Sequence, residues 1–426
     1  MSAHEAIDVA LTRLAREDGP RVLSVLASRF GDLDLADDAV QDALVDATRT
    51  WPRDGMPGNP GGWLMTAARN RATDRLRRQA STSRRLASSQ AELVERRIPS
   101  DAGGLAMIDN VDNADDRDDP SELGDERLRL MLLCCHPALG GDAQVALILR
   151  LVAGLTTEEI AAAFLVPPST MAQRIVRAKR KIRTAAIPMS MPDGLDDRLG
   201  ILLDTLYLVF NEGYLAHGDE QKPIRLELMS EALRLTRLLI ELSDRHPEVL
   251  GLLAMELFAR SRTGARTGAE NELILLEDQD RTTWDLADIH EANAALAEAM
   301  ARMQPGPRQV QALIGSHHAN ARTAEETDWP AIVGLYAQLD AMVDSPVIAL
   351  NHAVAVAMAD GPLHGLRLVE GLEGLDDYHL YWSAVAELNV RAGRSDEAIP
   401  AFERSLALTT NEAERRHLTK RLAELG

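Results

Sequence analysis

The sequence predicts an all-α protein, and three observations support this fold class. Aromatic residues, which favour strands, make up only 4% of the 426 residues. Apolar residues recur at three- and four-residue spacing along almost the whole chain, as they do on one face of a helix. Ala, Leu, Arg and Glu, which favour helices, dominate the composition. Because the chain is longer than one hydrophobic core usually covers, we expect two or three domains.

Composition divides the chain into four parts. These are a helical domain at 1–85, a linker at 86–123, a second helical domain at 124–187 and a long helical domain at 188–426. Both short domains end in a basic run, whereas the linker is acidic and loses periodicity, as expected of a flexible segment. The Pro- and Gly-containing stretch 188–194 is the best boundary for the last domain.

The last domain contains a segment with the spacing of a tetratricopeptide repeat. The large and small residues that fit its packing positions are Trp382, Val385, Ala386, Gly393, Ala398 and Phe402. The stretch 350–372 has the same order of helix, turn and helix, with weaker identities. We therefore expect a tetratricopeptide-like helical array at this end of the chain. Residues 195–345 are helical by pattern alone.

The second basic run has the parts of a helix-turn-helix. Thr156 or Thr157 is expected to cap a first helix. After a turn at 166–168, Ser169 is expected to cap a basic second helix over 170–183, which in such motifs lies in the DNA major groove. A solvated basic helix would give a similar pattern. The candidate DNA-binding residues here are Ser169, Thr170, Gln173, Arg174, Arg177 and Lys181.

The first basic run, 69–78, follows the acidic segment Asp-Asp-Ala-Val-Gln-Asp-Ala-Leu at 37–44 and the segment Asn-Pro-Gly-Gly-Trp at 59–63. This arrangement resembles region 2 of extracytoplasmic-function (ECF) sigma factors, and the helix-turn-helix resembles their region 4. The two motifs occur in the same order as in that family, and the likeness covers about residues 5–185.

The resemblance implies two binding surfaces. The polar face of the acidic helix would dock on core RNA polymerase through Asp37, Asp38, Gln41 and Asp42. The basic helix would contact promoter DNA through Arg69, Asn70, Arg71, Arg75, Arg77 and Arg78. The loop expected at 52–62 would capture a flipped base, whereas Trp63 continues an apolar face and is expected to pack in the core. The linker would follow the channel for nascent RNA or act as a simple tether.

Several function classes find no support in the sequence. The net charge of -20 argues against a protein that coats nucleic acid through bulk charge. No catalytic, metal-binding or cofactor-binding pattern is convincing: Cys134 and Cys135 are expected to be small buried residues, and His317 and His318 point in different directions on a helix. We expect no signal peptide, no membrane span and a cytoplasmic location.

The leading interpretation is a sigma factor with no enzymatic activity of its own. Its last domain would bind a regulatory protein or a ligand and control the promoter-reading half, or would only stabilise it. The main alternative is a helix-turn-helix regulator with a ligand-sensing or partner-sensing domain, and an enzyme in the last domain has little support. The segment 211–214, Asn-Glu-Gly-Tyr, resembles one found in sigma factors with such extensions and is expected to pack at a helix end.

Overall fold

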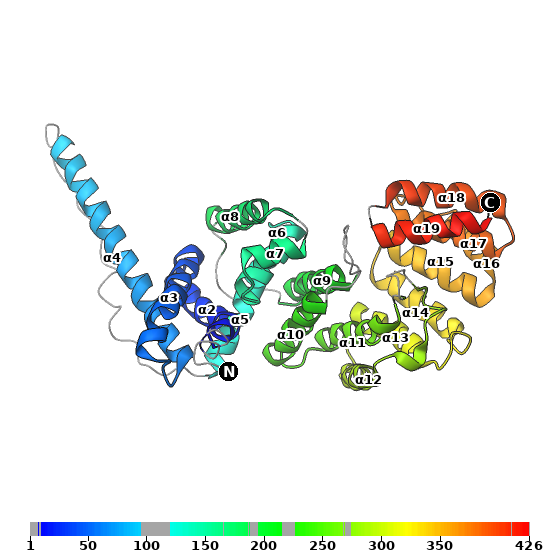
Figure 1. The fold of residues 1–426 in the computed structure, drawn as a ribbon, viewed down its shortest axis with the longest axis horizontal. Helices are drawn as coiled ribbons and strands as arrows, with labels where there is room; N and C mark the ends of the chain where they lie inside the picture. The colour runs from blue at the N-terminus through cyan, green and yellow to red at the C-terminus, as the bar shows by residue number, and fades with distance from the viewer. Residues whose placement is uncertain are drawn as a thin grey trace. The chain divides into compact units, whose positions relative to one another are not determined.

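The protein is described by a computed structural model (Figure 1). The described residues are 7, 10–94, 120–164, 166–185, 187, 195–214, 226–266, 268, 274–409 and 411–425. They form helices joined by turns, and these ranges contain no strand, which confirms the all-α prediction. The chain divides into two compact units, the first made of Met1–Ile160 and Pro168–Leu202, the second of Ala161–Pro167 and Leu203–Gly426.

The first half of the first unit is built on two long helices. The elements are the short π-helix η1 (Leu14–Asp18), α2 (Gly19–Phe30), α3 (Leu33–Asp54) and α4 (Pro60–Val94). Asp32 caps α3 by accepting a hydrogen bond from the Leu35 backbone N–H at 3.0 Å. Small residues such as Ala39 and Ala72 are fully buried, which lets α3 and α4 pack closely.

The segment between α3 and α4 is shorter than the sequence predicted. α3 continues to Asp54 with Pro52 inside its last turn, so only residues 55–59 form the loop. Trp51 is buried and its ring lies edge-on to the ring of Trp63, with centroids 5.5 Å apart. Trp63 itself is half-buried, so it packs against the core residue Trp51 without being enclosed in the core.

α4 also continues to Val94, past the predicted linker start at 86. Residues 86–94 contain Leu, Ala, Gln and Glu, which are strong helix formers and extend the helix. The acidic part of the expected linker, from 95 to 119, and the expected boundary at 188–194 lie outside the described residues.

The second half of the first unit contains five helical segments. They are α5 (Pro120–Cys134), α6 (Gly141–Leu147), the π-helix η2 (Ile148–Val152), the start of α7 (Thr157–Ala163), which belongs to this unit as far as Ile160, and α8 (Pro168–Thr184). Cys134 and Cys135 are free thiols with no exposed surface, as expected, and burial raises the pKa of Cys134. At Gly154 the φ angle is 73°, and an added Cβ would lie 2.8 Å from the Ala15 carbonyl oxygen. Glycine therefore allows this turn to pack against the start of the unit.

The second unit begins within α9 (Leu195–Tyr214). It continues through α10 (Leu226–Leu242), α11 (Pro247–Ser261), the 3-10 helices η3 (Thr263–Ala265) and η4 (Arg281–Thr283), α12 (Leu286–Ala301), α13 (Pro307–Asn320) and α14 (Trp329–Met342). Helices α11 and α13 approach closely at Gly251, where an added Cβ would lie 2.8 Å from the Gln309 backbone nitrogen. Beside this contact, the Glu248 carboxylate accepts the backbone N–H groups of Arg308 and Gln309 at 2.9 and 3.3 Å. A side chain of α11 therefore caps the first turn of α13.

The unit ends in a series of paired helices. These are α15 (Pro346–Asp360), α16 (Pro362–Val369), α17 (His379–Arg391), α18 (Ser395–Leu408) and α19 (Glu412–Leu425). The predicted repeat corresponds to the pair α17 and α18, whose turn contains Gly393 at φ 71°. Ala386, Ala398 and Phe402 are buried in one cluster against which Trp382 packs, so the sequence located these packing residues. Every helix in the described ranges is too short or too polar to cross a membrane.

Candidate nucleic-acid interface

The helix-turn-helix expected from the sequence is formed by α7 and α8. Thr156 is the cap: its hydroxyl accepts the Glu159 backbone N–H at 3.1 Å, and the Glu159 carboxylate accepts the Thr156 N–H at 2.7 Å. This reciprocal pair is a capping box. Ser169 does not cap α8, because the helix already begins at Pro168, whose restricted φ suits a first helical turn. The predicted start of α8 at Thr170 is therefore wrong by two residues.

The buried and polar faces of α8 are clearly separated. Met171, Ile175, Ala178 and Ile182 face the core. Of the six candidate DNA-binding residues, all except the half-buried Arg174 are exposed. Thr170, Gln173, Arg174, Arg177 and Lys181 line one groove of about 340 Å³ beside Leu139, Gly140 and Ala143. The groove contains three basic residues, and its only described ion pair joins Arg174 to the exposed Asp142 at 3.3 Å.

The basic residues of α4 fall into two groups. Asn70, Arg71, Arg77 and Arg78 are exposed, whereas Arg69 and Arg75 are half-buried. Arg75 donates to the carboxylates of Asp38 and Asp42, the latter at 2.7 Å, and Arg71 donates to Asp46 at 3.0 Å. Burial lowers the pKa of Arg75, but its hydrogen bonds to Asp38 and Asp42 outweigh this and raise the pKa above its ordinary value. Arg71 and Arg75 therefore join α4 to α3.

One face of α3 carries a row of carboxylates, which we call the acidic row and which consists of Asp34, Asp37, Asp38, Asp42 and Asp46. Asp34, Asp38, Asp42 and Asp46 follow one another at four-residue spacing on one side of the helix, and Asp37 lies three residues after Asp34 on the flank of this row. Arginines of α4 bind the last three of these residues, and basic residues of α8 bind the first two. The acidic row therefore lies between the two basic helices of this unit.

The contacts from α8 involve its C-terminal half. The Lys179 ammonium lies 2.5 Å from an Asp37 carboxylate oxygen, and Arg183 lies 2.5 Å from Asp34. Asp37 is only 7% exposed, so the expectation that it lies on an outer polar face is wrong in this arrangement. Asp38 is exposed, and Gln41 and Asp42 are half-buried.

Sequence reasoning did not select four residues that complete this arrangement: Asp34, Asp46, Lys179 and Arg183. Asp34 and Asp46 could have been found by extending the acidic pattern one turn in each direction along the helix. Lys179 and Arg183 could not be distinguished from the other basic residues of α8, because their partners are more than one hundred residues away in the chain.

Three protein families match separate parts of the chain. The family described as Sigma-70 region 2 matches residues 14–82, and Sigma-70, region 4 matches residues 129–182. The first match contains η1, α2, α3 and most of α4, and the second contains α6, α7 and most of α8. A family of unknown function, DUF6596, matches residues 198–300.

Individual relatives agree with these family matches. An uncharacterized protein of Rhizobium meliloti (strain 1021) is 41% identical over 423 residues, which cover 99% of this chain and 96% of the relative. The ECF RNA polymerase sigma-E factor of Escherichia coli (strain K12) is 31% identical over 166 residues, which cover 38% of this chain and 80% of the relative. The sigma-E factor of Salmonella typhimurium (strain LT2) is 30% identical over the same length.

No solved structure matches the chain. Among the residues that the structure describes, no group of three or more His, Cys, Asp or Glu side chains could hold a metal ion.

Proposed function

Because the chain belongs to the ECF family of sigma-70 factors, which are non-enzymatic transcription initiation factors, we propose that it binds core RNA polymerase and directs it to a specific set of promoters. The observation that carries this proposal is the ordered pair of basic helices, α4 and α8, with the acidic row of α3 between them. A simple helix-turn-helix regulator would need α7 and α8 but would have no use for residues 37–78. The proposal places the chain in the cytoplasm, where polymerase and DNA are found.

The upstream promoter element is assigned to α8. Its exposed groove presents Gln173, Arg174 and Arg177, which can donate hydrogen bonds to base edges, and Lys181, which suits a phosphate. Ser169 and Thr170, at the start of the helix, would contact the backbone. The buried residues Met171, Ile175, Ala178 and Ile182 anchor α8 on the core of its unit, which gives base reading a fixed helix.

The downstream element and the melting of DNA are assigned to α4 and the loop at 55–59. Asn70 and Arg77 are exposed, and together with Arg69, Arg71 and Arg78 they give α4 a basic surface that suits the backbone of an open strand. Arg75 has two carboxylate partners, so its role is to position α4 on α3. The short loop between these helices is the place where an unstacked base would be held.

The acidic row is assigned to core polymerase. Asp38, Gln41 and Asp42 are accessible at least in part, but Asp37 is covered by Lys179. Docking through Asp37 therefore requires α8 to leave α3, which would expose the start of the acidic row. The arrangement described here would then be a closed form of the free factor, and polymerase would select an open one.

The second unit is assigned a regulatory role. The two promoter-reading segments end at residue 187, yet more than half of the chain follows, and its paired helices provide surfaces that can hold a partner. A regulatory protein or a ligand bound there would control the first unit. A purely stabilising appendage is the competing explanation.

The decisive experiment is run-off transcription with purified core polymerase, the full chain and a promoter library. We expect selected transcripts that require both the chain and core enzyme. DNA binding without polymerase binding and without transcripts would instead support the helix-turn-helix regulator. A chain that ends at residue 187, compared at equal folded concentration, tests regulation: a changed promoter output supports it, and unchanged output under all conditions contradicts it.

A further inference from the structure

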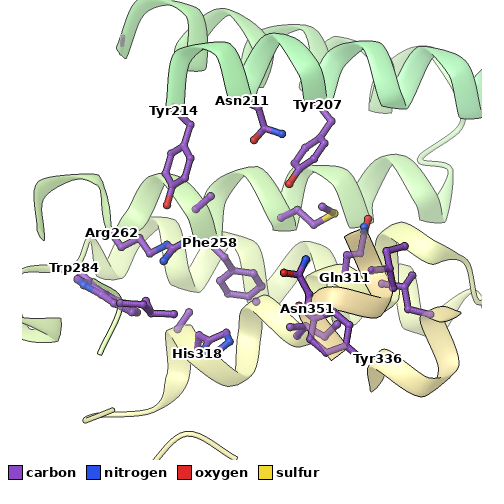
Figure 2. Close-up of a pocket in the computed structure, with 18 residues that line it drawn as sticks. Tyr207, Asn211, Tyr214, Phe258, Arg262, Trp284, Gln311, His318, Tyr336 and Asn351 are labelled. Atoms are coloured by element: carbon purple, nitrogen blue, oxygen red, sulfur yellow. The ribbon is translucent and has the colours of Figure 1, made fainter. Parts of the chain in front are cut away.

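The helices of the second unit enclose a cavity. The cavity has a volume of about 370 Å³, which lies in the size range of small-molecule sites (Figure 2). Its wall comes from α9, α11, α13, α14 and α15, and from Leu276 and Trp284 in the segment between α11 and α12. Segments from 207 to 351 therefore meet around one space, and the matched family at 198–300 supplies only part of it.

Aromatic side chains are concentrated in this wall. The chain has only five tyrosines, and three of them, Tyr207, Tyr214 and Tyr336, line the cavity. Phe258 and Trp284 add two more rings. In Figure 2 the rings of Tyr207 and Tyr214 extend from α9 toward α11, and the ring of Tyr336 lies on the opposite side. In a protein so poor in aromatic residues, this concentration favours a flat, unsaturated ligand over an aliphatic one.

Several polar atoms of the wall have no hydrogen-bond partner within the described part of the chain. They are the Tyr214 hydroxyl, the Trp284 Nε1–H and the His318 Nδ1. Tyr214 is 7% exposed and Trp284 is 4% exposed, so bulk water does not solvate these groups freely. Buried polar groups are nearly always hydrogen-bonded, and a polar ligand at this end of the cavity would satisfy them.

The same end of the cavity is cationic. Arg262 lines the wall, and its guanidinium lies 5.6 Å from the centre of the Tyr214 ring. The Arg266 guanidinium lies 3.7 Å from the same centre, and that of Arg281 lies 5.1 Å from the Trp284 ring centre. Arg262 is the arginine that lines the cavity, and no Asp or Glu lines it, whereas Arg266 and Arg281 are not lining residues and are influenced by the charges of Glu414 and Glu325. An anion would therefore find positive charge there without competition from a wall carboxylate.

The His318 side chain reports the same electrostatic environment. Burial, followed by the nearby charges of Arg262 and Arg281, lowers the pKa of His318 to about 4. His318 is therefore neutral near pH 7, and its ring lies edge-on to Trp329 at 5.2 Å. A neutral imidazole can donate one hydrogen bond to an anion and adds no negative charge.

The opposite end of the cavity is polar but uncharged. Gln311 and Asn351 line it with their amide groups near Tyr336, whereas Asn211 lies on α9 between Tyr207 and Tyr214 (Figure 2). Phe258 lies between this end and Arg262. The site thus has a cationic end, an aromatic middle and an amide end.

We propose that this cavity binds a small organic acid that carries a flat unsaturated ring, with its carboxylate at Arg262, Tyr214, Trp284 and His318 and its ring against Phe258 and Tyr207. The segment 211–214 then has a role beyond helix-end packing, because Asn211 and Tyr214 both line the site. Such a ligand would join α9 to α13, α14 and α15 and would stabilise their packing. This inference does not depend on promoter recognition, since binding is measured without polymerase or DNA.

The test is isothermal titration calorimetry of the full chain near pH 7 with benzoate as the probe. Benzamide keeps the ring and lacks the charge, whereas acetate keeps the charge and lacks the ring. We expect saturable benzoate binding, and binding at least tenfold weaker for both benzamide and acetate. Benzamide binding as tightly as benzoate, or no saturable benzoate binding at millimolar concentration, would overturn the proposal.

Variants locate the site. Arg262→Gln should weaken benzoate binding at least tenfold, and Tyr214→Phe should weaken it by a smaller factor. Arg322→Gln, which changes an exposed arginine of the same unit, is the matched control and should bind as the parent chain does. If Arg262→Gln does not fold, Ala259→Leu fills the cavity from α11 without changing charge and should abolish binding. Unchanged affinity in a folded Ala259→Leu variant would place the probe elsewhere and contradict the proposal.

Discussion

The Lys179 ammonium lies 2.5 Å from the Asp37 carboxylate, and the two side chains are only 12% and 9% exposed. Lys179 belongs to the helix assigned to the upstream promoter element, and Asp37 belongs to the row assigned to core polymerase. One ion pair therefore holds the helix assigned to DNA against a residue assigned to polymerase, and leaves the exposed groove of α8 uncovered. Because the pair is largely desolvated, removing either partner leaves a buried charge, which costs about 3–5 kcal/mol.

Lys179→Met should release α8 from α3 while keeping the aliphatic part of the side chain. We expect this variant to bind core polymerase several-fold more tightly, because the closed form no longer competes with docking. Asp37→Asn opens the same contact but removes a carboxylate assigned to polymerase, so it should not show this gain. Lys420→Met, on the exposed surface of α19, is the control. Surface plasmon resonance on immobilised core enzyme measures all three, and an unchanged affinity for Lys179→Met would contradict a closed form held by this pair.

Arg177→Ala should weaken binding of the holoenzyme to the upstream element. Arg177 is exposed in the α8 groove, and the loss of one base-reading arginine costs about 1–3 kcal/mol and changes sequence preference. Fluorescence anisotropy with a set of upstream duplexes distinguishes this from a phosphate contact, which would weaken every duplex equally. Arg322→Ala should leave all affinities unchanged. If Arg177→Ala also leaves the affinities for all duplexes unchanged, α8 does not lie in the DNA major groove as proposed.

Arg75→Ala and Arg77→Ala should separate a positioning residue from a DNA-contacting one. Arg75 bridges Asp38 and Asp42 and is about one-third exposed, so we expect a loss of roughly 1 kcal/mol in local stability. Hydrogen exchange of α3 and α4 amides would detect it. Arg77 is exposed, so its removal should leave exchange unchanged and should lower the salt dependence of promoter binding by about one ion. If the α3 and α4 amides exchange at the same rate in Arg75→Ala as in Arg77→Ala, Arg75 does not position α4 on α3.

Glu256→Gln should change how the stability of the second unit depends on pH. Glu256 has no exposed surface, and burial raises its pKa from 4.5 to about 8, although the Thr236 hydroxyl donates to it at 3.1 Å. Between these two values the folded chain holds a proton that the unfolded chain releases, so stability falls as pH rises through this window. The slope is about 1.4 kcal/mol per pH unit. Thermal unfolding from about pH 5 to about pH 8 should show this loss in the parent chain and not in Glu256→Gln, and parallel profiles would contradict a buried protonated carboxyl.

The local pattern of the sequence determined the elements of this protein. Apolar residues at helical spacing gave the helices, Thr156 and the acidic residues after it gave the start of α7, and the spacing from Trp382 to Phe402 gave the packed pair α17 and α18. These features depend on residues that are close in the chain, so periodicity and capping rules detect them. The same rules missed the start of α8 and the end of α3, because prolines at 168 and 52 fit inside helical turns there.

The tertiary structure alone decided which side chains meet. Asp37 and Lys179 are 142 positions apart, and Arg75 is 33 positions from Asp42, so no local pattern shows that the two predicted surfaces cover one another. The cavity also depends on residues that are distant in the chain, since Tyr207 and Asn351 line the same cavity only after the helices pack. Periodicity determines which face of each helix turns inward, but the position of one helix against another is set by packing among residues far apart in the chain.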